Sequence, residues 1–236
     1  MQTEFVPHGV YEDIINLLGQ WKVLDIKSLS RLCSYDVQYY NLLHKVRKLE
    51  KHGLIKGVLT GGKNKHIYLT SEGLRLTPYD RTYEICDESL THDLVVGNVL
   101  RSFLALPNFT DGKMFHQIDE LSLFPDAEIV GTQNKECYRL ALEVELTQKE
   151  QLRVKEKFRK YGNSKVFNYA LFISNKEPLF KAYRRYLMEM KPEIQEAVIL
   201  LLDEKLTVSR FDCENSRLFY LGKEIGFCDI FGERRI

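Results

Sequence analysis

The 236-residue sequence predicts a protein of mixed α+β or α/β class, built from two successive parts. Three segments with helical spacing of apolar residues and two short strand-like runs fill the first part. In the second part strands alternate with helices, which is typical of an α/β core with a mixed sheet. We therefore expect one domain over residues 1–80 and a second over residues 81–236.

Composition excludes several classes of protein. Hydrophobic residues make up 44% of the chain and charged residues 28%, as in a globular protein and unlike a disordered one. The best apolar run, AVILLL at 197–202, is far shorter than the ~18–20 residues that span a membrane. The first residues lack the basic and apolar regions of a secretory signal, so we expect none. Five widely spaced cysteines without metal-ligand spacing favour reduced thiols. We expect a cytoplasmic protein without membrane contact.

The net charge of +1 hides an uneven distribution of charge along the chain. Residues 1–75 contain 11 Lys and Arg against 7 Asp and Glu, and residues 149–191 contain 12 against 4. The rest of the chain after residue 75 is therefore strongly acidic. Near-zero net charge alone argues mildly against a nucleic-acid partner, and a single basic run is more typical of a solvated helix face. Two basic regions on either side of an acidic one are more informative together.

Apolar periodicity predicts helices over residues 11–21, 26–33 and 37–53. Asp25 is suited to cap the second helix and Asp36 the third. The apolar stripe of the third helix has spacings of 4 and 3 and consists of Leu42, Val46 and Leu49. Gly53 has the residue type that commonly follows a helix C-terminus.

Two short strands follow, over residues 54–59 and 66–69, joined by a turn rich in Gly and Lys. Three helices followed by a two-stranded hairpin is the element order of a winged helix-turn-helix. The stretch KVRKLEKHGLIKG…KNKHIYLTSEG also resembles winged-helix DNA-binding domains. In such a domain the third helix would enter a major groove of DNA.

Several non-core residues of the third helix have side chains able to reach bases or phosphates: Gln38, Tyr39, Asn41, His44, Lys45 and Lys48. Lys63 and Lys65 at the tip of the hairpin would lie near the DNA backbone. Tyr35, Tyr39 and Tyr40 have rings that could stack on bases, but aromatic residues at helical spacing more often belong to a core. The alternative for this part is a winged helix that contacts only proteins.

The second part reads as alternating helices and strands. Helical patterns cover residues 92–106, 147–162 and 178–190, and the first of these begins at His92 and Asp93. Strand patterns cover residues 114–123, 124–130, 138–146, 169–173 and 198–202. The residues after 206 alternate only weakly and predict further strands or an exposed arm.

Three carboxylates are expected to meet in this second part. Alternation in YRLALEVEL (138–146) places Glu143 and Glu145 on one face of a strand, and Asp126 follows a proline 17 positions before Glu143. Neighbouring carboxylates repel and are tolerated together if a hard divalent cation neutralises them. Such a cation can polarise a phosphate and acidify a bound water, as phosphodiester hydrolysis requires. The alternative is that both glutamates lie on the solvent face of an edge strand and Asp126 in a turn.

The next helix carries six cations that would hold flanking phosphates: Lys149, Arg153, Lys155, Lys157, Arg159 and Lys160. The sequence Pro125-Asp126, then Glu143-Val144-Glu145 and a basic helix ending at Tyr161, resembles the PD-(D/E)XK nuclease superfamily. LTHDLVVGNVL, FPDAEI and ALEVELTQ…KFRKY are more specifically similar to the plasmid replication-relaxation proteins and the MOBC-class mobilisation relaxases. The resemblance covers roughly residues 90–175 and, more loosely, residues 10–75. One departure is that Glu145 stands where the nuclease pattern has its lysine.

The resemblance implies a metal-dependent DNA endonuclease that nicks one strand at a plasmid or mobile-element origin of transfer or replication. It implies that Asp126, Glu143 and Glu145 bind Mg²⁺ or Mn²⁺, and that His92 or Asp93 contributes from the preceding helix. A nearby catalytic cation would come from Lys157 or Lys149, while Lys149 and Arg153 would contact DNA. Mobilisation or replication accessory proteins are further expected partners.

Other interpretations stay open. His92 alone is more typical of a packing or helix-start residue. Tyr161 is expected to pack or to contact phosphate rather than to form a covalent intermediate, because a metal-activated water suffices for this chemistry. The chain as a whole is alternatively a non-catalytic winged-helix DNA-binding regulator, or a transposon- or restriction-type endonuclease that cuts both strands.

Overall fold

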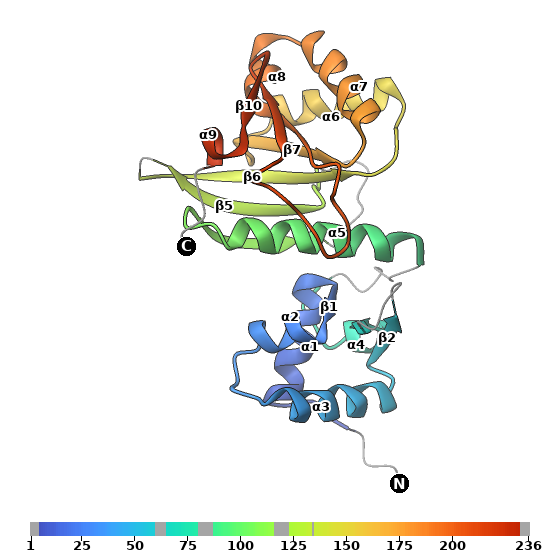
Figure 1. The fold of residues 1–236 in the computed structure, drawn as a ribbon. Coiled ribbons are helices and arrows are strands. Elements are labelled where there is room, and N and C mark those ends of the chain that lie inside the picture. Colours follow the sequence, from blue (N-terminus) through green and yellow to red (C-terminus); the bar gives the residue numbers. More distant parts are fainter. Residues whose placement is uncertain (1–4, 60–64, 80–86, 116–122, 134, 232–236) are drawn as a thin grey trace. The chain divides into compact units, whose positions relative to one another are not determined.

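The computed structural model describes residues 5–59, 65–79, 87–115, 123–133 and 135–231. The chain forms two compact units, a first unit over Met1–Asp93 and a second unit over Leu94–Ile236 (Figure 1). The expected domain boundary at residue 80 falls in a segment outside the described residues. None of the helices in the described part of the chain is long and apolar enough to cross a membrane.

The first unit contains the three helices and the two hairpin strands that the sequence predicts. They are α1 (Val10–Trp21), α2 (Ile26–Leu32), α3 (Tyr39–Lys51), β2 (Ile55–Leu59) and β3 (Lys65–Leu69). A short strand, β1 (Val23–Asp25), and a one-turn helix, α4 (Ser71–Leu74), were not expected. The strands form one antiparallel sheet in the order β1-β3-β2.

Capping explains two of the helix boundaries in the first unit. The Asp25 side chain accepts a hydrogen bond from the Ser28 N–H at 2.9 Å, so it caps α2 as expected. The prediction for Asp36 was wrong, because α3 begins later and Gln38 is its N-cap residue. Gly53 follows α3 with a φ of 70°, a conformation that glycine adopts without steric cost.

The second unit is built on one seven-stranded mixed sheet, which confirms the α/β core at that level. Its strand order is β10-β9-β8-β7-β6-β5-β4, and only the pairs β6/β7 and β7/β8 are parallel. The strands are β4 (Phe109–Met114), β5 (Ala127–Gln133), β6 (Glu136–Glu145), β7 (Tyr169–Ser174), β8 (Val198–Leu202), β9 (Arg217–Tyr220) and β10 (Lys223–Gly226).

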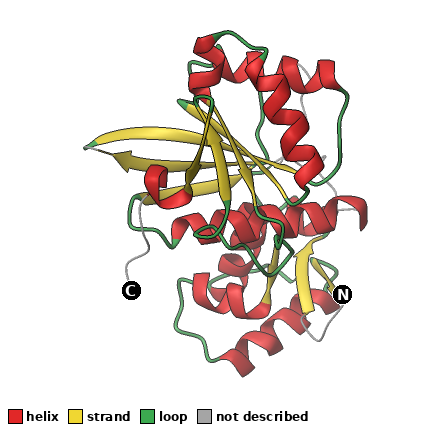
Figure 2. Cartoon of the chain, turned by 45° about the horizontal axis from the view of Figure 1, so that its top comes forward, coloured by secondary structure: helices red, strands yellow, loops and turns green. Residues whose placement is uncertain are grey.

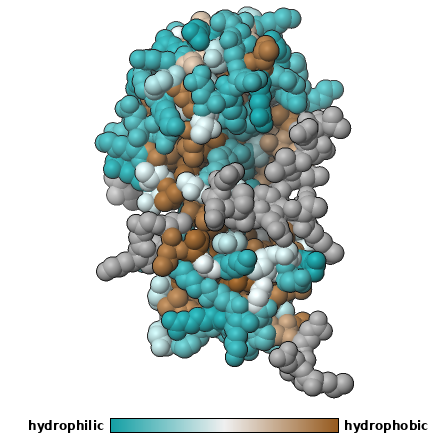
Figure 3. All heavy atoms as spheres, turned by 90° about the vertical axis from the view of Figure 1, so that its right-hand side faces the viewer, coloured by the Kyte–Doolittle hydropathy of each residue, from teal (hydrophilic) through white to brown (hydrophobic). Residues whose placement is uncertain are grey.

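Helices cover both faces of this sheet (Figures 1 and 2). On one side lie α6 (Gln151–Gly162), α7 (Glu177–Met188) and α8 (Pro192–Ala197). Their buried side chains, among them Phe158 and Tyr183, form a hydrophobic cluster with Ala141 of β6 and Phe172 of β7. The residues that α6–α8 present to solvent are mostly hydrophilic, as the upper part of Figure 3 shows.

The other face packs against α5 (Asp87–Leu104) and α9 (Phe227–Phe231). The Phe103 ring lies 5.2 Å from that of Phe109 on β4, 5.6 Å from that of Phe227 and 5.4 Å from that of Phe231. The weakly patterned C-terminal residues therefore belong to the folded unit, as β9, β10 and α9. Strand β4 ends at Met114, and residues 116–122 of the strand expected over residues 114–123 lie outside the described residues.

Candidate functional site

The sheet of the second unit brings Glu143 and Glu145 into its interior. Strand β6 lies between β5 and β7, so Glu143 is register partner to Phe172 and Glu145 to Ser174 on the parallel strand. Both glutamates point to the α6–α8 face, as the alternation predicts. Their exposed fractions are 1% and 2%, so the solvent-face alternative does not describe them.

Asp126 lies beside them, immediately before β5. Its N–H donates to the Leu142 carbonyl at 3.0 Å, and its carboxylate accepts a hydrogen bond from the Val144 N–H at 2.7 Å. The backbone of β6 thus holds one oxygen of Asp126 at Val144, the residue that lies between Glu143 and Glu145 in the strand. We call Asp126, Glu143 and Glu145 the carboxylate cluster.

Helix α6 brings a cation and a phenol onto Glu143. The Lys157 Nζ lies 2.5 Å from Oε2 of Glu143 and 3.8 Å from Oε1 of Glu145. The Tyr161 hydroxyl donates a short hydrogen bond to Oε1 of Glu143. Lys157 and Tyr161 are four residues apart and therefore share one face of the helix.

Glu145 has a second ammonium group beside it. The Lys149 Nζ lies 2.9 Å from Oε1 and 2.8 Å from Oε2 of Glu145. Tyr183 of α7 also lies near Glu145. Burial and the charge of Glu145 raise the pKa of the Tyr183 phenol. No sequence pattern indicates Tyr183, because α7 reaches the cluster only through the packing of the second unit.

The environment raises the pKa of all three central groups, which favours the neutral forms of Glu143 and Tyr161 and the charged form of Lys157. Burial raises the pKa of Glu143 to about 7; the charge of Lys157 opposes this shift and the charge of Asp126 adds to it. Burial tends to lower the pKa of Lys157, but the charges of Glu143, Asp126 and Glu145 raise it above its ordinary value. Burial and the Glu143 charge hold the pKa of Tyr161 far above its ordinary value, so this phenol remains a proton donor.

The carboxylate oxygens are the ligand type that Mg²⁺ and Mn²⁺ prefer, but their arrangement does not offer a metal site. Glu143 is held by Lys157 and Tyr161, Glu145 by Lys149, and Asp126 by a backbone N–H. Within the described ranges, no group of three or more His, Cys, Asp or Glu side chains is spaced to hold a metal ion. A divalent cation therefore does not fit the cluster as the chain arranges it, and the metal remains a prediction.

His92 and Asp93 belong to the first unit. Helix α5 begins at Asp87, so the expectation that it begins at His92 was wrong. The buried Asp93 accepts a hydrogen bond from the Lys22 ammonium at 3.1 Å, and His92 Nδ1 lies 4.0 Å from the same oxygen. The Asp93 carboxylate is thus engaged within the first unit, and a catalytic role for His92 remains a prediction.

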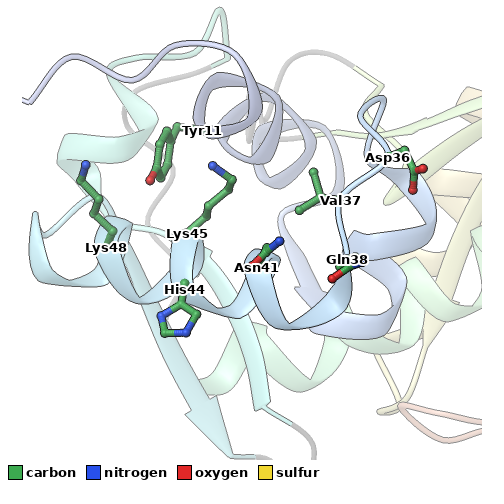
Figure 4. Close-up of a pocket in the computed structure, with 8 residues that line it drawn as sticks. All are labelled: Tyr11, Asp36, Val37, Gln38, Asn41, His44, Lys45 and Lys48. Atoms are coloured by element: carbon green, nitrogen blue, oxygen red, sulfur yellow. The ribbon is translucent and has the colours of Figure 1, made fainter.

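A second polar surface lies along α3 in the first unit. It surrounds an open hollow of about 810 Å³, whose lining residues Figure 4 shows: Tyr11, Asp36, Val37, Gln38, Asn41, His44, Lys45 and Lys48. Lys45 Nζ lies 4.6 Å and Lys48 Nζ 5.3 Å from the centre of the Tyr11 ring. His44 points away from Tyr11 (Figure 4). Leu42, Val46 and Leu49 are buried as predicted, which leaves the polar face of α3 outward.

The outward face of α3 extends beyond the residues that the sequence indicated. Tyr40 is 67% exposed, and Tyr35 and Tyr39 are also exposed, so the expectation that these rings belong to a core was wrong. The Tyr40 and His44 rings meet edge to face at 4.8 Å. Two exposed cations, Arg47 and Lys51, lie on the same stripe and were missed, although the spacing 40, 44, 47, 51 would have found them.

The remaining expected DNA contacts are placed as follows. Lys65 forms an ion pair with Glu50 at 2.5 Å, and Lys63 lies outside the described residues. On α6, Arg153 is exposed, whereas the ammonium group of Lys149 is bound to Glu145. We call the outward side chains of α3 the α3 surface: Gln38, Tyr39, Tyr40, Asn41, His44, Lys45, Arg47, Lys48 and Lys51.

Comparisons with known proteins do not assign this chain to a family. No family model matches the chain, and no curated protein matches it. A solved structure described as that of the restriction endonuclease FokI matches 75% of this chain at 12% identity, with a TM-score of 0.24. The match covers 39% of that protein, so the chain spans about two fifths of its length. A TM-score this low carries no argument, and the function is therefore inferred from the two polar surfaces.

Proposed function

We propose that the chain is a DNA endonuclease in which the α3 surface binds DNA and the carboxylate cluster cleaves a phosphodiester bond. The observation that carries the proposal is the convergence of Asp126, Glu143 and Glu145 with Lys157 and Tyr161, of which the two glutamates and the tyrosine are buried. Buried carboxylates are costly, and such concentrations of perturbed groups are typical of functional sites.

The residues of the cluster have distinct parts in this proposal. Lys157 is 26% exposed, so its ammonium is the group that an approaching phosphate meets. A phosphate that attracts Lys157 releases Oε2 of Glu143, while Tyr161 keeps Oε1 in place. With a pKa of about 7, Glu143 suits the transfer of a proton from the attacking water near neutral pH. Mg²⁺ or Mn²⁺ is the cofactor that the sequence resemblance implies.

Binding of DNA is assigned to the first unit. The order α1-β1-α2-α3-β2-β3 and the outward polar face of α3 support a winged helix-turn-helix whose third helix enters the major groove. Asn41 and Gln38 have side chains that pair with base edges, and Arg47, Lys48 and Lys51 suit phosphates. The finer proposal is a relaxase-type enzyme that nicks one strand at a plasmid or mobile-element origin of transfer or replication.

Nicking of supercoiled plasmid DNA tests the proposal. A DNA site that the protein binds is first selected from a library of sequences and cloned into the plasmid. The reaction then contains Mg²⁺, Mn²⁺ or EDTA. Wild type is expected to give open circles, while Asp126→Ala and Glu143→Ala give none and bind the same DNA. Lys181→Ala is the matched control, because Lys181 of α7 pairs with Glu177 outside the cluster and is not one of the six cations expected to hold phosphates. Equal nicking by wild type and both cluster variants would refute the proposal, and linear product would identify an enzyme that cuts both strands.

A second candidate function is a non-catalytic DNA-binding regulator. It is favoured by the observation that donors of the chain itself engage all three carboxylates of the cluster. In that case the second unit serves as a partner or oligomerisation module. Tight DNA binding with no cleavage under any metal condition would support this function.

A further inference from the structure

A cavity lies on the face of the seven-stranded sheet opposite to the carboxylate cluster. Its volume is about 370 Å³, a size that suits a small molecule. Tyr138 and Leu140 of β6 line it, and because side chains alternate along a strand, they point away from the side of Glu143. The floor of the cavity is apolar, and its residues Leu140 and Ile199 are almost fully buried.

Three tyrosines from different strands line the walls of this cavity: Tyr138 of β6, Tyr169 of β7 and Tyr220 of β9. The rings of Tyr138 and Tyr169 lie 6.1 Å apart at an angle of 81°, so they form two walls nearly at a right angle. Strand β7 lies between β6 and β9, and Tyr169 adds to the effect of burial in raising the pKa of both other phenols. Rings arranged in this way can present their electron-rich faces to one bound group.

The charge of the lining has a single sign. Of the described residues that line the cavity, only Asp229 of α9 is charged. Its side chain is exposed at the rim, and one carboxylate oxygen accepts a hydrogen bond from the Gly226 N–H at 2.9 Å, which holds it in place. An anionic ligand would meet this carboxylate with no cation of the lining to bind it, whereas a cationic ligand would be attracted.

Rings on the α6–α8 side of the sheet are covered by cations of the chain itself. Arg184 Cζ lies 4.5 Å from the centre of the Phe219 ring, and Arg217 Cζ lies 5.7 Å from that of Phe180. Within the part of the chain that the structure describes, no Lys or Arg side chain covers the three tyrosines of the cavity in this way. Their rings are half-buried, so a ligand can reach them.

We propose that this cavity binds a small organic cation with a quaternary ammonium group, held by the rings of Tyr138, Tyr169 and Tyr220 and by the carboxylate of Asp229. A quaternary ammonium group donates no hydrogen bond, so it enters an apolar cavity without leaving a donor unpaired, and aromatic faces compensate its charge. The cavity includes no residue of the carboxylate cluster or of the α3 surface, so the inference does not depend on cleavage of DNA.

Two probes of the same shape separate cation binding from the burial of an apolar group. Choline carries the quaternary ammonium group, and its tert-butyl analogue has a neutral carbon in place of the nitrogen. The methyl protons of each probe give a single line in proton NMR, and the broadening of this line on titration with the full chain gives Kd. Choline is expected to bind at least about tenfold more tightly than the analogue. Equal affinity for the two probes, or no binding of choline, overturns the inference.

Variants test whether the binding takes place in this cavity. Tyr169→Leu keeps an apolar side chain but removes the ring, and is expected to weaken choline binding about tenfold, while Tyr169→Phe retains it. Asp229→Asn can still accept the Gly226 N–H and is expected to weaken choline binding severalfold, because only the charge is lost. Tyr68→Leu, on β3 of the first unit, is the matched control and is expected to bind choline as wild type does.

Undiminished choline binding by both Tyr169→Leu and Asp229→Asn overturns the inference. The comparison of the two probes needs only the wild-type chain, and it decides the question if Tyr169→Leu does not fold.

Discussion

The α3 surface and the carboxylate cluster are both groups of polar side chains next to a helix. They differ in what balances their charge: solvent for the α3 surface and lysines of the same chain for the cluster. Arg47, Lys48 and Lys51 lie exposed on α3, where water screens them. Glu143 and Glu145 are buried, and lysines of the same chain neutralise them. The cations of α3 are therefore accessible from solvent. The glutamates are accessible to a ligand only if it displaces the lysines of the same chain.

The largest difference is expected in stability. Phe158 is fully buried beside the cluster, with its ring 4.9 Å from Phe172 and 6.0 Å from Tyr183. Phe158→Ala is expected to lower the free energy of unfolding of the second unit by about 3–5 kcal/mol, because it leaves a cavity. The exposed Tyr40→Ala on α3 is expected to change it by less than about 0.5 kcal/mol. Urea denaturation measures both free energies of unfolding. A loss of several kcal/mol from Tyr40→Ala would contradict the difference between the two surfaces.

The next effect is a pH dependence that only the buried cluster has. The pKa of Glu143 is raised from 4.5 to about 7, so the fold favours its protonated form. The contribution of protonated Glu143 to the free energy of unfolding is fully present below pH 4.5 and is lost as pH rises through about 7. In the metal-free chain this loss is on the order of 3 kcal/mol. The difference in unfolding free energy between wild type and Glu143→Gln measures it. A difference that stays constant from pH 4.5 to 8 would contradict this assignment.

A smaller effect is expected for base recognition by α3. Asn41 lines the hollow on α3, and an asparagine that pairs with a base edge contributes about 1–3 kcal/mol of discrimination. Asn41→Ala is expected to bind selected and altered sites with more similar affinity. Competition binding with single-base variants of the site measures this loss. Retained discrimination at every base would exclude Asn41 as a reading residue.

The smallest effect per residue concerns the exposed cations. Arg47→Gln and Lys48→Gln are each expected to reduce the slope of log Kd against log salt by about 0.9, because each removes one phosphate contact. Glu143→Gln serves as the control and is expected to leave the slope unchanged. Fluorescence anisotropy over a range of salt concentrations gives the slopes, and equal slopes for all chains would argue against DNA contacts by α3.

The same contrast explains what could be predicted from the sequence. Periodicity located α3 and its buried stripe of Leu42, Val46 and Leu49, and alternation placed Glu143 and Glu145 on one face of β6. These patterns depend on neighbouring residues within one element. They do not predict that Lys157 of α6 contacts Glu143, which lies 14 residues earlier, or that Tyr183 of α7 lies near Glu145.

Two further differences have local causes. Asp36 has a good capping side chain, but α3 starts at Tyr39, out of its reach as N-cap. The residues after 206 alternate weakly because β9 and β10 are only four residues long each, and β10 lies at the edge of the sheet. Short strands give too few alternations for a clear pattern.

The central claim is that binding and cleavage of DNA belong to different surfaces of one chain. The most direct measurement compares DNA affinity and plasmid nicking, in the same buffer, for wild type, Glu143→Gln and the double variant Arg47→Gln/Lys48→Gln. We predict that Glu143→Gln binds as wild type does and does not nick, while the double variant binds weakly and nicks at a rate that high protein concentration restores. Undiminished nicking by Glu143→Gln would contradict the account.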